Sequence, residues 1–304
     1  VKGATNDGLG IQCKQKRDGS VAIAKVYQGP ARRAGLHRGD HLKLVDGQQV
    51  TSVQQVHQLF EHAHGRPFKV TVERRGKLLD LDLRHGSANV TPVRKTMTKD
   101  GIGYIRPLWF SPGMTDNVAR AVAHLERTNK GPLKGLVVDL RGNPGGYVPE
   151  AISLLNYFIK DGTLHSWVNR DGVMLDVMAD STRTVRPHLS LAVLVNKKSA
   201  SASELFASRI QDHKRGLVVG DNTFGKGVAQ ITVPFYDGSA LKMTTQRSIR
   251  KDGFTVDKVG VRPDVTREQA RKHYQEMHPQ ARRAKKPVDY ALEEARFLLR
   301  QDER

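Results

Sequence analysis

The alternation of apolar strands with helices from about residue 90 onward restricts the fold of this chain more than any other feature. Residues 136–140 and 189–195 are continuous apolar runs of the kind that form strands buried on both faces. Apolar residues at helical spacing follow these runs, over 147–159 and over 203–210. The same patterns predict a strand over 103–107, a helix over 115–128 and a strand over 217–219. Such alternation predicts a layered α/β core.

A different pattern precedes this core. Strands are expected over 10–14, 21–27, 41–45, 68–73 and 78–83, and helices over 30–34 and 53–63. Pro30 and Gly35 stand where a short helix prefers its first residue and its stop, and Asp46-Gly47 is a hairpin-turn signal. We expect three parts: a small unit at 5–86, the core at 87–266, and a charged helical extension at 267–304 that packs on the core. The fold class is then α/β in the core and α+β overall.

Three loops of small residues follow apolar strands at their carboxyl ends, where ligand crevices of α/β sheets form. They are Asp-Leu-Arg-Gly-Asn-Pro-Gly-Gly at 139–146, Ser-Ala-Ser-Ala-Ser-Glu at 199–204 and Thr-Phe-Gly-Lys-Gly at 223–227. The first is a tight turn before a helix, and the second opens a helix. Asp139 is expected to be structural and to hold its turn together with Arg141. We expect the three loops to meet at one edge of the sheet and to form the functional site.

The loops contain a serine and a lysine that could act together. A serine hydroxyl attacks a carbonyl only when a neighbouring base removes its proton. His213 is the only histidine near these loops, and it falls at the end of a helix, where a surface histidine favoured by the helix dipole is the simpler interpretation. A neutral lysine can serve instead. Lowering a lysine pKa from ~10.4 to about 7 costs roughly 4 kcal/mol, which burial can provide. Lys226, between two glycines and with few charges nearby, has the expected setting.

An oxyanion hole is the second requirement of such chemistry. Backbone N–H groups at a helix start are unpaired, so the Ala202 amide beside Ser201 is one expected donor. Gly145 and Gly146 lack Cβ atoms, so their turn can bring a second amide close to a substrate.

Residues 134–265 resemble the catalytic core of the carboxyl-terminal processing (tail-specific) proteases, which have a crotonase-like fold. The resemblance rests on the three loops and on four later matches: Gln211-Asp212, Gln230, Thr244-Thr245 and Gly-Val-x-Pro-Asp at 260–264. In that family the middle serine attacks, the lysine of Phe-Gly-Lys-Gly is the general base, and the glutamine four residues on orients it. The resemblance therefore implies Ser201, Lys226 and Gln230 as the catalytic residues of a serine endopeptidase that uses no cofactor.

Residues 5–86 resemble a PDZ domain of the bacterial protease type. The resemblance rests on Gly8-Leu9-Gly10-Ile11, on Gly29-Pro30-Ala31 with Ala34-Gly35-Leu36, and on Gly-Asp-His-Leu at 39–42 leading to Asp46-Gly47. Backbone amides of the loop at Gly8 and Gly10 are expected to hold a peptide carboxylate while the adjacent strand edge pairs with the peptide. Leu9, Ile11, Val56 and Leu59 are expected to take an apolar terminal side chain. The expected partners are thus proteins or peptides with apolar C-termini, which the PDZ domain captures while it gates the site.

The sequence departs from the family pattern in three places. Gly142 stands where the family often has a polar residue, and the stretch 247–253 is more basic than usual, which is expected to alter the substrate groove. We also expect the helical segment that commonly precedes the PDZ domain in this family to be absent here. The resemblance favours an exported protein of the periplasm or cell envelope rather than a cytoplasmic one, with the signal segment outside this chain.

Composition limits the other classes of function. The chain has 50 Lys and Arg against 31 Asp and Glu, which gives a net charge of +19. The basic residues are scattered along the sequence, and only 6% of all residues are aromatic. Weak electrostatic attraction to anionic envelope surfaces is expected rather than specific nucleic-acid binding. Cys13, the single cysteine, excludes an intrachain disulfide and is expected to be a small buried hydrophobe. The twelve histidines lack ligand spacing, so no metal site is predicted.

Other interpretations of the same residues stay open at this point. Ser201 could merely cap a helix, although Ser203 is the better predicted N-cap because apolar residues follow it at once. Gln230 could be an ordinary residue of a strand edge. The stretch 220–226 fits the first seven positions of a phosphate-binding loop, but Gly227 replaces the Ser or Thr that would hold magnesium. A catalytically idle PDZ scaffold that binds tails without cutting them is the main alternative to a protease.

Overall fold

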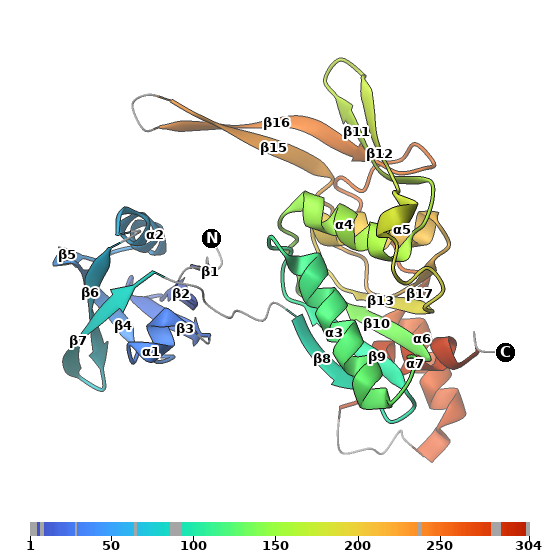
Figure 1. Cartoon of the computed structure of the whole chain (residues 1–304), viewed down its shortest axis with the longest axis horizontal. Coiled ribbons are helices and arrows are strands. Elements are labelled where there is room, and N and C mark those ends of the chain that lie inside the picture. Colours follow the sequence, from blue (N-terminus) through green and yellow to red (C-terminus); the bar gives the residue numbers. More distant parts are fainter. Residues whose placement is uncertain are drawn as a thin grey trace. The chain divides into compact units, whose positions relative to one another are not determined.

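The computed structural model of the chain describes residues 5–6, 9–27, 29–63, 66–85, 93–235, 239–280 and 287–301. These residues belong to two compact units, Val1–Thr91 and Pro92–Arg304 (Figure 1). The described residues of the first unit form one sheet and one core, and those of the second form two sheets and two cores. Within the described ranges, no helix is both long enough and apolar enough to cross a membrane.

The N-terminal unit consists of one sheet and two helices. Its strands run in the order β1-β2-β3-β4-β6-β7, and β5 pairs with β4. The strands are β1 Thr5–Asn6, β2 Ile11–Gln15, β3 Val21–Val26, β4 His41–Val45, β5 Gln48–Gln49, β6 Pro67–Arg74 and β7 Lys77–Arg84; the helices are α1 Pro30–Arg33 and α2 Val53–His62. Apolar residues that alternate along the strands pack against Val56 and Phe60 of α2 to form one core. Cys13 is buried in this core, as predicted.

The C-terminal unit is built on a six-stranded sheet. Its order is β17-β14-β13-β10-β9-β8, and all neighbours are parallel except β8 and β9. The strands are β8 Val93–Met97, β9 Ile102–Pro107, β10 Gly135–Asp139, β13 Leu191–Val195, β14 Gly216–Gly220 and β17 Val265–Thr266. All five residues of β10 and of β13 are buried, as the continuous apolar runs predicted.

Helices cover both faces of this sheet. The helices of one face are α3 Met114–Asn129, α4 Val148–Phe158 and α5 Ala202–Asp212, and those of the C-terminal segment are α6 Arg267–Met277 and α7 Tyr290–Gln301. The larger core joins alternate strand residues, such as Val138 and Val193, to α3, α4 and α5. The other strand residues, such as Val137 and Leu194, pack against Ala295 and Leu299 of α7. The layered α/β core predicted from the alternation of strands and helices is therefore confirmed.

A second, four-stranded sheet lies beside α4 and α5 (Figure 1). Its order is β12-β11-β16-β15, with all neighbours antiparallel. The strands are β11 Thr163–Asn169, β12 Met174–Met178, β15 Val228–Pro234 and β16 Ala240–Ile249, and a short 3-10 helix, η1 Ser181–Arg183, follows β12. The hairpin of β15 and β16 extends away from the helices of its unit. Because β15 begins directly after residues 223–227, this sheet continues from the third small-residue loop.

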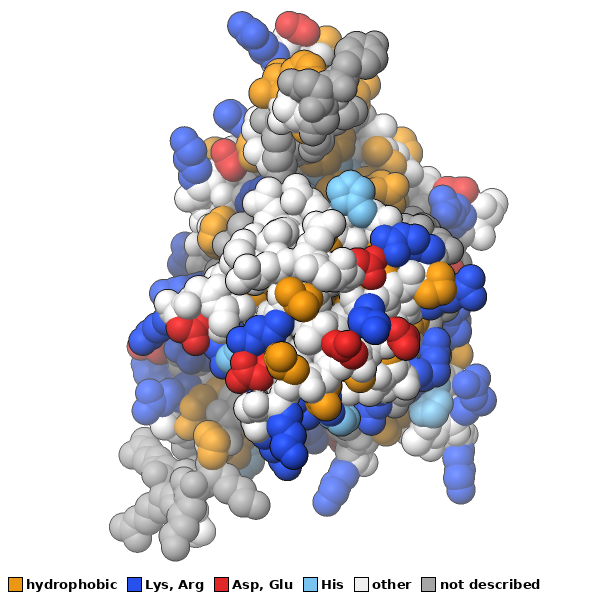
Figure 2. All heavy atoms as spheres, turned by 90° about the vertical axis from the view of Figure 1, so that its left-hand side faces the viewer, with side chains coloured by type: hydrophobic (Ala, Val, Ile, Leu, Met, Phe, Trp, Pro, Cys, Tyr) orange, Lys and Arg blue, Asp and Glu red, His pale blue; other side chains and the backbone are white. Residues whose placement is uncertain are grey.

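The face that Figure 2 presents shows how charged side chains are distributed on one side of the molecule. In the face that Figure 2 presents, Lys and Arg side chains stand among Asp and Glu side chains rather than over one element. The described residues of this face therefore form no compact basic patch.

Candidate active site

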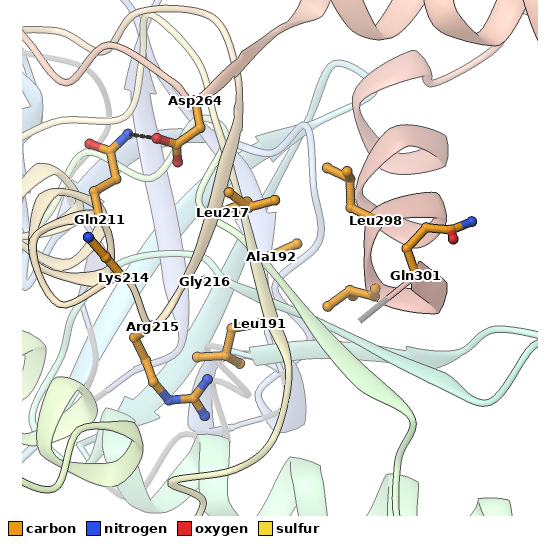
Figure 3. A pocket seen from close by; sticks show the side chains of 11 residues that line it. Leu191, Ala192, Gln211, Lys214, Arg215, Gly216, Leu217, Asp264, Leu298 and Gln301 are labelled. Atoms are coloured by element: carbon orange, nitrogen blue, oxygen red, sulfur yellow. Dashed lines mark hydrogen bonds between the residues drawn. The ribbon is translucent and has the colours of Figure 1, made fainter. Parts of the chain in front are cut away.

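Two hollows in the C-terminal unit are candidates for chemistry. The larger, about 480 Å³, lies at the amino ends of β13 and β14, between the end of α5 and the end of α7 (Figure 3). No serine, threonine or cysteine is among its lining residues. Asp264 accepts hydrogen bonds there from Gln211 and from the Val218 amide, and Arg215 donates to three backbone carbonyls. These polar groups hold the fold together, and no hydroxyl or thiol nucleophile is among the residues that line this hollow.

The smaller hollow lies at the opposite, carboxyl edge of the sheet. β10, β13 and β14 are parallel neighbours, so the loops that follow them meet at this edge. Ser201 and Lys226 line one narrow pocket of about 20 Å³, together with apolar side chains and Ser248. Its apolar lining consists of Val148, Trp167, Ala202, Leu205, Val228 and Val256. The structure therefore brings the predicted nucleophile and the predicted base to the same pocket.

Ser201 has an unusual backbone conformation at the start of α5. Its φ is 57° and its ψ −119°, in a region that residues with a side chain seldom adopt. Ser201 occupies the N-cap position of α5, and Ser203 lies inside the helix, where its hydroxyl donates to the Asn143 carbonyl. The prediction that Ser203 caps the helix is therefore wrong. Strained backbone is typical of functional positions, and here it presents Ser201 at the pocket.

The turn at 139–146 is held by its own side chains. Asp139 is fully buried and accepts from the Arg141 amide and guanidinium, as expected from the sequence, and also from the Tyr104 hydroxyl. Burial raises the pKa of Tyr104 to about 12, and the bond to Asp139 acts in the same direction. Arg141 also contacts Asp289, just before α7, at 2.7 Å. The C-terminal helices are thus fastened to this turn.

Two glycines of this turn approach the neighbouring loops closely. A Cβ on Gly145, whose φ is 93°, would lie 2.8 Å from Ser201 Cβ and 2.9 Å from the Ala202 nitrogen. A Cβ on Gly146, whose φ is 140°, would lie 2.1 Å from the Phe110 carbonyl oxygen. Neither position can carry a side chain without movement of the backbone, so the turn requires glycine at both.

The structure narrows the set of predicted oxyanion donors. The Gly145 amide already donates to Asn143 Oδ1 at 2.9 Å, so it is not available to a substrate in this conformation. Among the described residues, neither the Gly146 amide nor the Ala202 amide has an identified hydrogen-bond acceptor. Gly146 is exposed, and Ala202 is the first residue of α5. These two amides remain the candidates for an oxyanion hole.

The identified contacts that hold Lys226 in position are made by its backbone and not by its side-chain amine. Its amide donates to Glu204 Oε2 at 2.8 Å, and its side chain is exposed rather than buried as expected. In the part of the chain that the structure describes, its amine makes no identified hydrogen bond or ion pair. The pocket is open to solvent on this side, which explains why the predicted burial of Lys226 is absent from the structure.

Glu204 is the residue of this site whose role sequence reasoning missed. It is fully buried and accepts four hydrogen bonds, two on each oxygen. Its donors are the Ser201 amide, the Thr223 hydroxyl and the amides of Gly225 and Lys226. Its position three residues after Ser201 is typical of a capping box, but the sequence favoured Ser203 as the N-cap, and a capping box says nothing about a second loop.

Gln230 and His213 lie apart from the pocket lining. The Gln230 amide donates to Thr244 Oγ1 at 3.2 Å, and the residue is exposed on β15. His213 follows α5, and its Nε2 contacts the Thr163 carbonyl at 2.8 Å. The structure does not bring either side chain to Ser201. The phosphate-loop alternative requires a helix directly after the loop, whereas residues 221–227 lead into β15 and so do not support it.

Trp167 connects the pocket to a buried histidine. The ring of His165 packs edge-on against Trp167 with centroids 4.1 Å apart, and His165 is fully buried. Neither ring nitrogen of His165 has a hydrogen-bond partner in the described part of the protein. Burial, aided by the charge of Arg209, lowers the pKa of His165 to about 3. The histidine is therefore a neutral packing residue behind the pocket wall.

The predicted peptide-binding residues of the N-terminal unit are mostly interior. Leu9, Ile11 and Val56 are at most 1% exposed, so their side chains stabilise the core, and only Leu59 of this set is partly exposed. Gly10 lies in the turn between β1 and β2, and Gly8 lies outside the described residues. The edge of β2 next to this loop pairs with β1 at Ile11 and Gln12, so it is not vacant along its first two residues.

Family models agree with this division of the chain. The model of "Peptidase family S41" matches residues 101–267, and that of the PDZ domain matches residues 8–84. The predicted fold class, a PDZ unit followed by an α/β protease-type core, is thereby confirmed.

The chain is also similar to proteins that are described as serine or carboxy-terminal processing proteases. The chain is 31% identical over 261 residues to a "Probable CtpA-like serine protease" of Staphylococcus haemolyticus, which covers 85% of this chain and 52% of that protein. It is 33% identical over 270 residues to the "Carboxy-terminal processing protease CtpA" of Bacillus subtilis, covering 87% of this chain and 57% of that protein. The chain thus spans between half and two thirds of the length of these relatives.

Solved structures share the fold. The "Photosystem II D1 C-terminal processing protease" has a TM-score of 0.53 and 28% identity, with 86% of this chain and 72% of that chain covered. A putative S41 protease from Bacteroides fragilis has a TM-score of 0.52 at 19% identity, covering 86% of this chain and 75% of that one. The second likeness concerns the fold alone.

Proposed function

The chain belongs to peptidase family S41, and we propose that it is a serine endopeptidase of the carboxyl-terminal processing type. Ser201 is the nucleophile, Lys226 the general base and Gln230 the residue that orients Lys226. The observation that carries this proposal is the shared pocket of Ser201 and Lys226. Among the described residues, the amides of Ala202, which follows the serine, and of Gly146, which follows the close-lying Gly145, have no identified acceptor.

The chemistry follows from these groups. Lys226 in its neutral form accepts the proton of the Ser201 hydroxyl as the oxygen attacks the scissile carbonyl. The carbonyl oxygen becomes negative and receives hydrogen bonds from the Gly146 and Ala202 amides. The protonated lysine then gives its proton to the leaving amine, and an acyl ester on Ser201 remains. A water, deprotonated by the same lysine, hydrolyses the ester and restores the serine.

The exposure of Lys226 adds a condition to this mechanism. A charged amine in water cannot accept a proton, and exclusion of water is what disfavours the charge. A substrate that lies across the narrow pocket covers both Ser201 and Lys226 because both line it. Binding of the peptide therefore completes the site as well as positioning the scissile bond.

The pocket also indicates the substrate. Its walls beside Ser201 are apolar, with Val148, Leu205 and Val256 among them, and it is narrow. A small apolar residue at the cleaved bond fits such a pocket better than a charged or large one.

The N-terminal unit supplies the second part of the proposal. The PDZ unit captures an apolar C-terminal tail and gates the site. The net charge of +19 favours a location beside the anionic surfaces of a cell envelope or periplasm.

A catalytically idle PDZ scaffold is the second candidate, since the same fold could bind tails without cutting them. A serine in strained backbone that shares a pocket with a lysine favours the protease, because binding alone requires neither of them.

Digestion of casein by the wild-type chain and by Ser201→Ala separates the two candidates. We expect fragments from the wild type and none from Ser201→Ala. The matched control is Ser208→Ala, since Ser208 is a buried serine of the same helix that does not line the pocket; its hydroxyl donates to the Leu205 carbonyl within α5. Ser208→Ala should cut at close to the wild-type rate. Equal digestion by wild type and Ser201→Ala would contradict the assignment, and no digestion by a folded wild type would favour the scaffold.

A further inference from the structure

One buried carboxylate connects the two loops that carry the proposed nucleophile and base. Glu204 Oε2 accepts from the amides of both Ser201 and Lys226, each at 2.8 Å. Its other oxygen, Oε1, accepts from the Thr223 hydroxyl and from the Gly225 amide, each at 2.6 Å. Three of the four donors belong to the loop after β14, and the fourth is the backbone of Ser201 itself.

These contacts exceed what a helix cap requires. In a capping box, a glutamate at this position satisfies only the amide of the N-cap residue of its own helix. Glu204 makes that bond and then reaches across to a loop 19 to 22 residues further along the chain. The side chain is fully buried, and none of the described residues pairs it with a cation. Burial of a carboxylate costs several kcal/mol, so its hydrogen bonds must offset that cost.

Several hydrogen bonds fix the conformation of the loop at residues 223–227. Thr223 donates to Glu204 and accepts from the Val261 amide at 2.6 Å, which anchors the start of the loop. The Phe224 amide donates to the Ser199 carbonyl at 3.0 Å. Lys226, at the end of the loop, is attached to the serine loop through Glu204 Oε2. A shift of this carboxylate therefore changes the separation of Ser201 and Lys226 directly.

We propose that Glu204 is a positioning residue that sets the distance between Ser201 and Lys226 through their backbone amides. The effect on catalysis rests on the proposed function, whereas the effect of Glu204 on the positions of the two loops does not. Glu204 touches neither substrate nor the reacting atoms and acts through the two loops. Small displacements of reacting groups lower rates by about 10²-fold, so this single side chain has a large effect on turnover.

The variant Glu204→Gln tests the proposal with little change in shape. An amide has one oxygen, so one of the two pairs of donors must then face an NH₂ group instead of an acceptor. The matched control is Glu150→Gln, because Glu150 accepts in a similar way from the amides of Gly113 and Thr115 at the start of α3. Glu204→Gln should lower kcat on casein-derived peptides by about 10²-fold with KM within about threefold. Glu150→Gln should leave kcat within about threefold.

A second variant keeps the proposal testable if Glu204→Gln does not fold. Thr223→Val removes one of the four donors and leaves the shared bonds of Oε2 in place, so we expect a several-fold loss of kcat. Wild-type kcat in whichever of these two variants folds would overturn the proposal. So would a change confined to KM, which would make Glu204 a residue of the substrate groove.

Hydrogen exchange separates this inference from the proposed function. In a Ser201→Ala background, which needs no activity, Glu204→Gln should accelerate exchange at the amides of residues 201 and 225–226 by at least about tenfold, and Glu150→Gln should not. Unchanged exchange at these amides would overturn the positioning role whatever the protein cleaves. Faster exchange in a protein whose wild type cuts nothing would support the geometry and sink only the proposed function.

Discussion

Gln230 on β15 donates its side-chain amide to the Oγ1 of Thr244 on β16, across 3.2 Å. The register pairs these two residues directly, next to an irregularity between Ala229 and Gln230, so the bond belongs to the sheet. The orienting role that the family resemblance implies for Gln230 therefore requires the side chain to leave Thr244 and turn toward Lys226.

Substitutions at these two positions should then have different effects. Gln230→Ala should lower kcat more than it raises KM, because the proposed role is to orient the lysine and not to bind the peptide. Thr244→Val removes the competing acceptor and should leave kcat unchanged or higher. Steady-state kinetics on one peptide measure both. Equal losses in the two variants would show that the bond between them matters only for the sheet.

Lys226→Ala should abolish peptide hydrolysis without loss of stability. The side chain is exposed and unpaired among the described residues, so its removal costs little folding free energy, whereas a positioned base contributes ~10²–10⁴-fold in rate. Lys226→Arg is the sharper companion because arginine keeps the charge but cannot be deprotonated. Both variants should be inactive with wild-type melting temperatures. More than about a tenth of the wild-type rate in either variant would sink the assignment of Lys226 as base.

The buried His165 predicts a specific pH dependence of stability. Burial lowers its pKa to about 3, against about 6.5 in the unfolded chain, so the unfolded state binds the extra proton between these values. Stability is then lost as pH falls below about 6.5, by about 1.4 kcal/mol per pH unit from this group. Urea unfolding at pH 7.5 and pH 5.0 should show a smaller acid loss in His165→Phe, by about 2 kcal/mol.

The control for this measurement is His124→Phe, since His124 is exposed on α3. It should retain the full acid loss of the wild type. An acid loss in His165→Phe as large as in the wild type would mean that other groups cause it.

The fold of the core was largely readable from the sequence because its strands are buried on both faces. The runs at 136–140 and 189–195 are apolar without interruption, and the structure has β10 and β13 there. Of the second sheet, the sequence indicated only a strand next to Gln230, within β15, because β11, β12 and β16 lack such a signal. All five residues of β12 are exposed, although four of them are large and apolar, so neither run length nor alternation marks the strand.

The site was only partly readable for a similar reason. Motif spacing predicted that Ser201 and Lys226 meet, because both loops follow parallel neighbouring strands. The contacts of Glu204 depend on how closely the loop after β14 folds over α5, which no local pattern encodes. The N-cap was misassigned to Ser203 because capping preferences assume ordinary backbone, whereas Ser201 begins the helix from a strained conformation.

Cys13 should be inert toward thiol reagents in the folded protein. It is 2% exposed, and burial raises its pKa to about 12, so both access and the thiolate fraction are small. At pH 8, reaction with a disulfide reagent such as DTNB should be at least about 10³-fold slower than in 6 M guanidinium. Val21→Ala, which opens the same core, is the companion variant and should react faster than the wild type. Rapid reaction of the native protein would show that the N-terminal core opens readily.

The last prediction concerns recognition of the tail by the N-terminal unit. Peptides that end in a free carboxylate after an apolar residue should be cut faster than the same peptides with amidated ends, because backbone amides of the loop before β2 are proposed to bind the carboxylate. The gain should appear in kcat/KM and should vanish when only residues 92–304 are present, a unit with its own two cores.

That shortened chain also tests the proposed gate. We expect it to cut unfolded casein faster than the full chain does, since an accessible serine and lysine would otherwise threaten any loose polypeptide nearby, and the PDZ unit is proposed to restrain them. Loss of all activity in a folded 92–304 chain would instead make the PDZ unit an activator. Equal rates for carboxylate and amide peptides in the full chain would show that the carboxylate is not recognised.

The pairing of β2 with β1 at Ile11 and Gln12 limits where a peptide can bind in the N-terminal unit. A peptide that adds to that edge of β2 must either displace β1 or pair beyond Gln12.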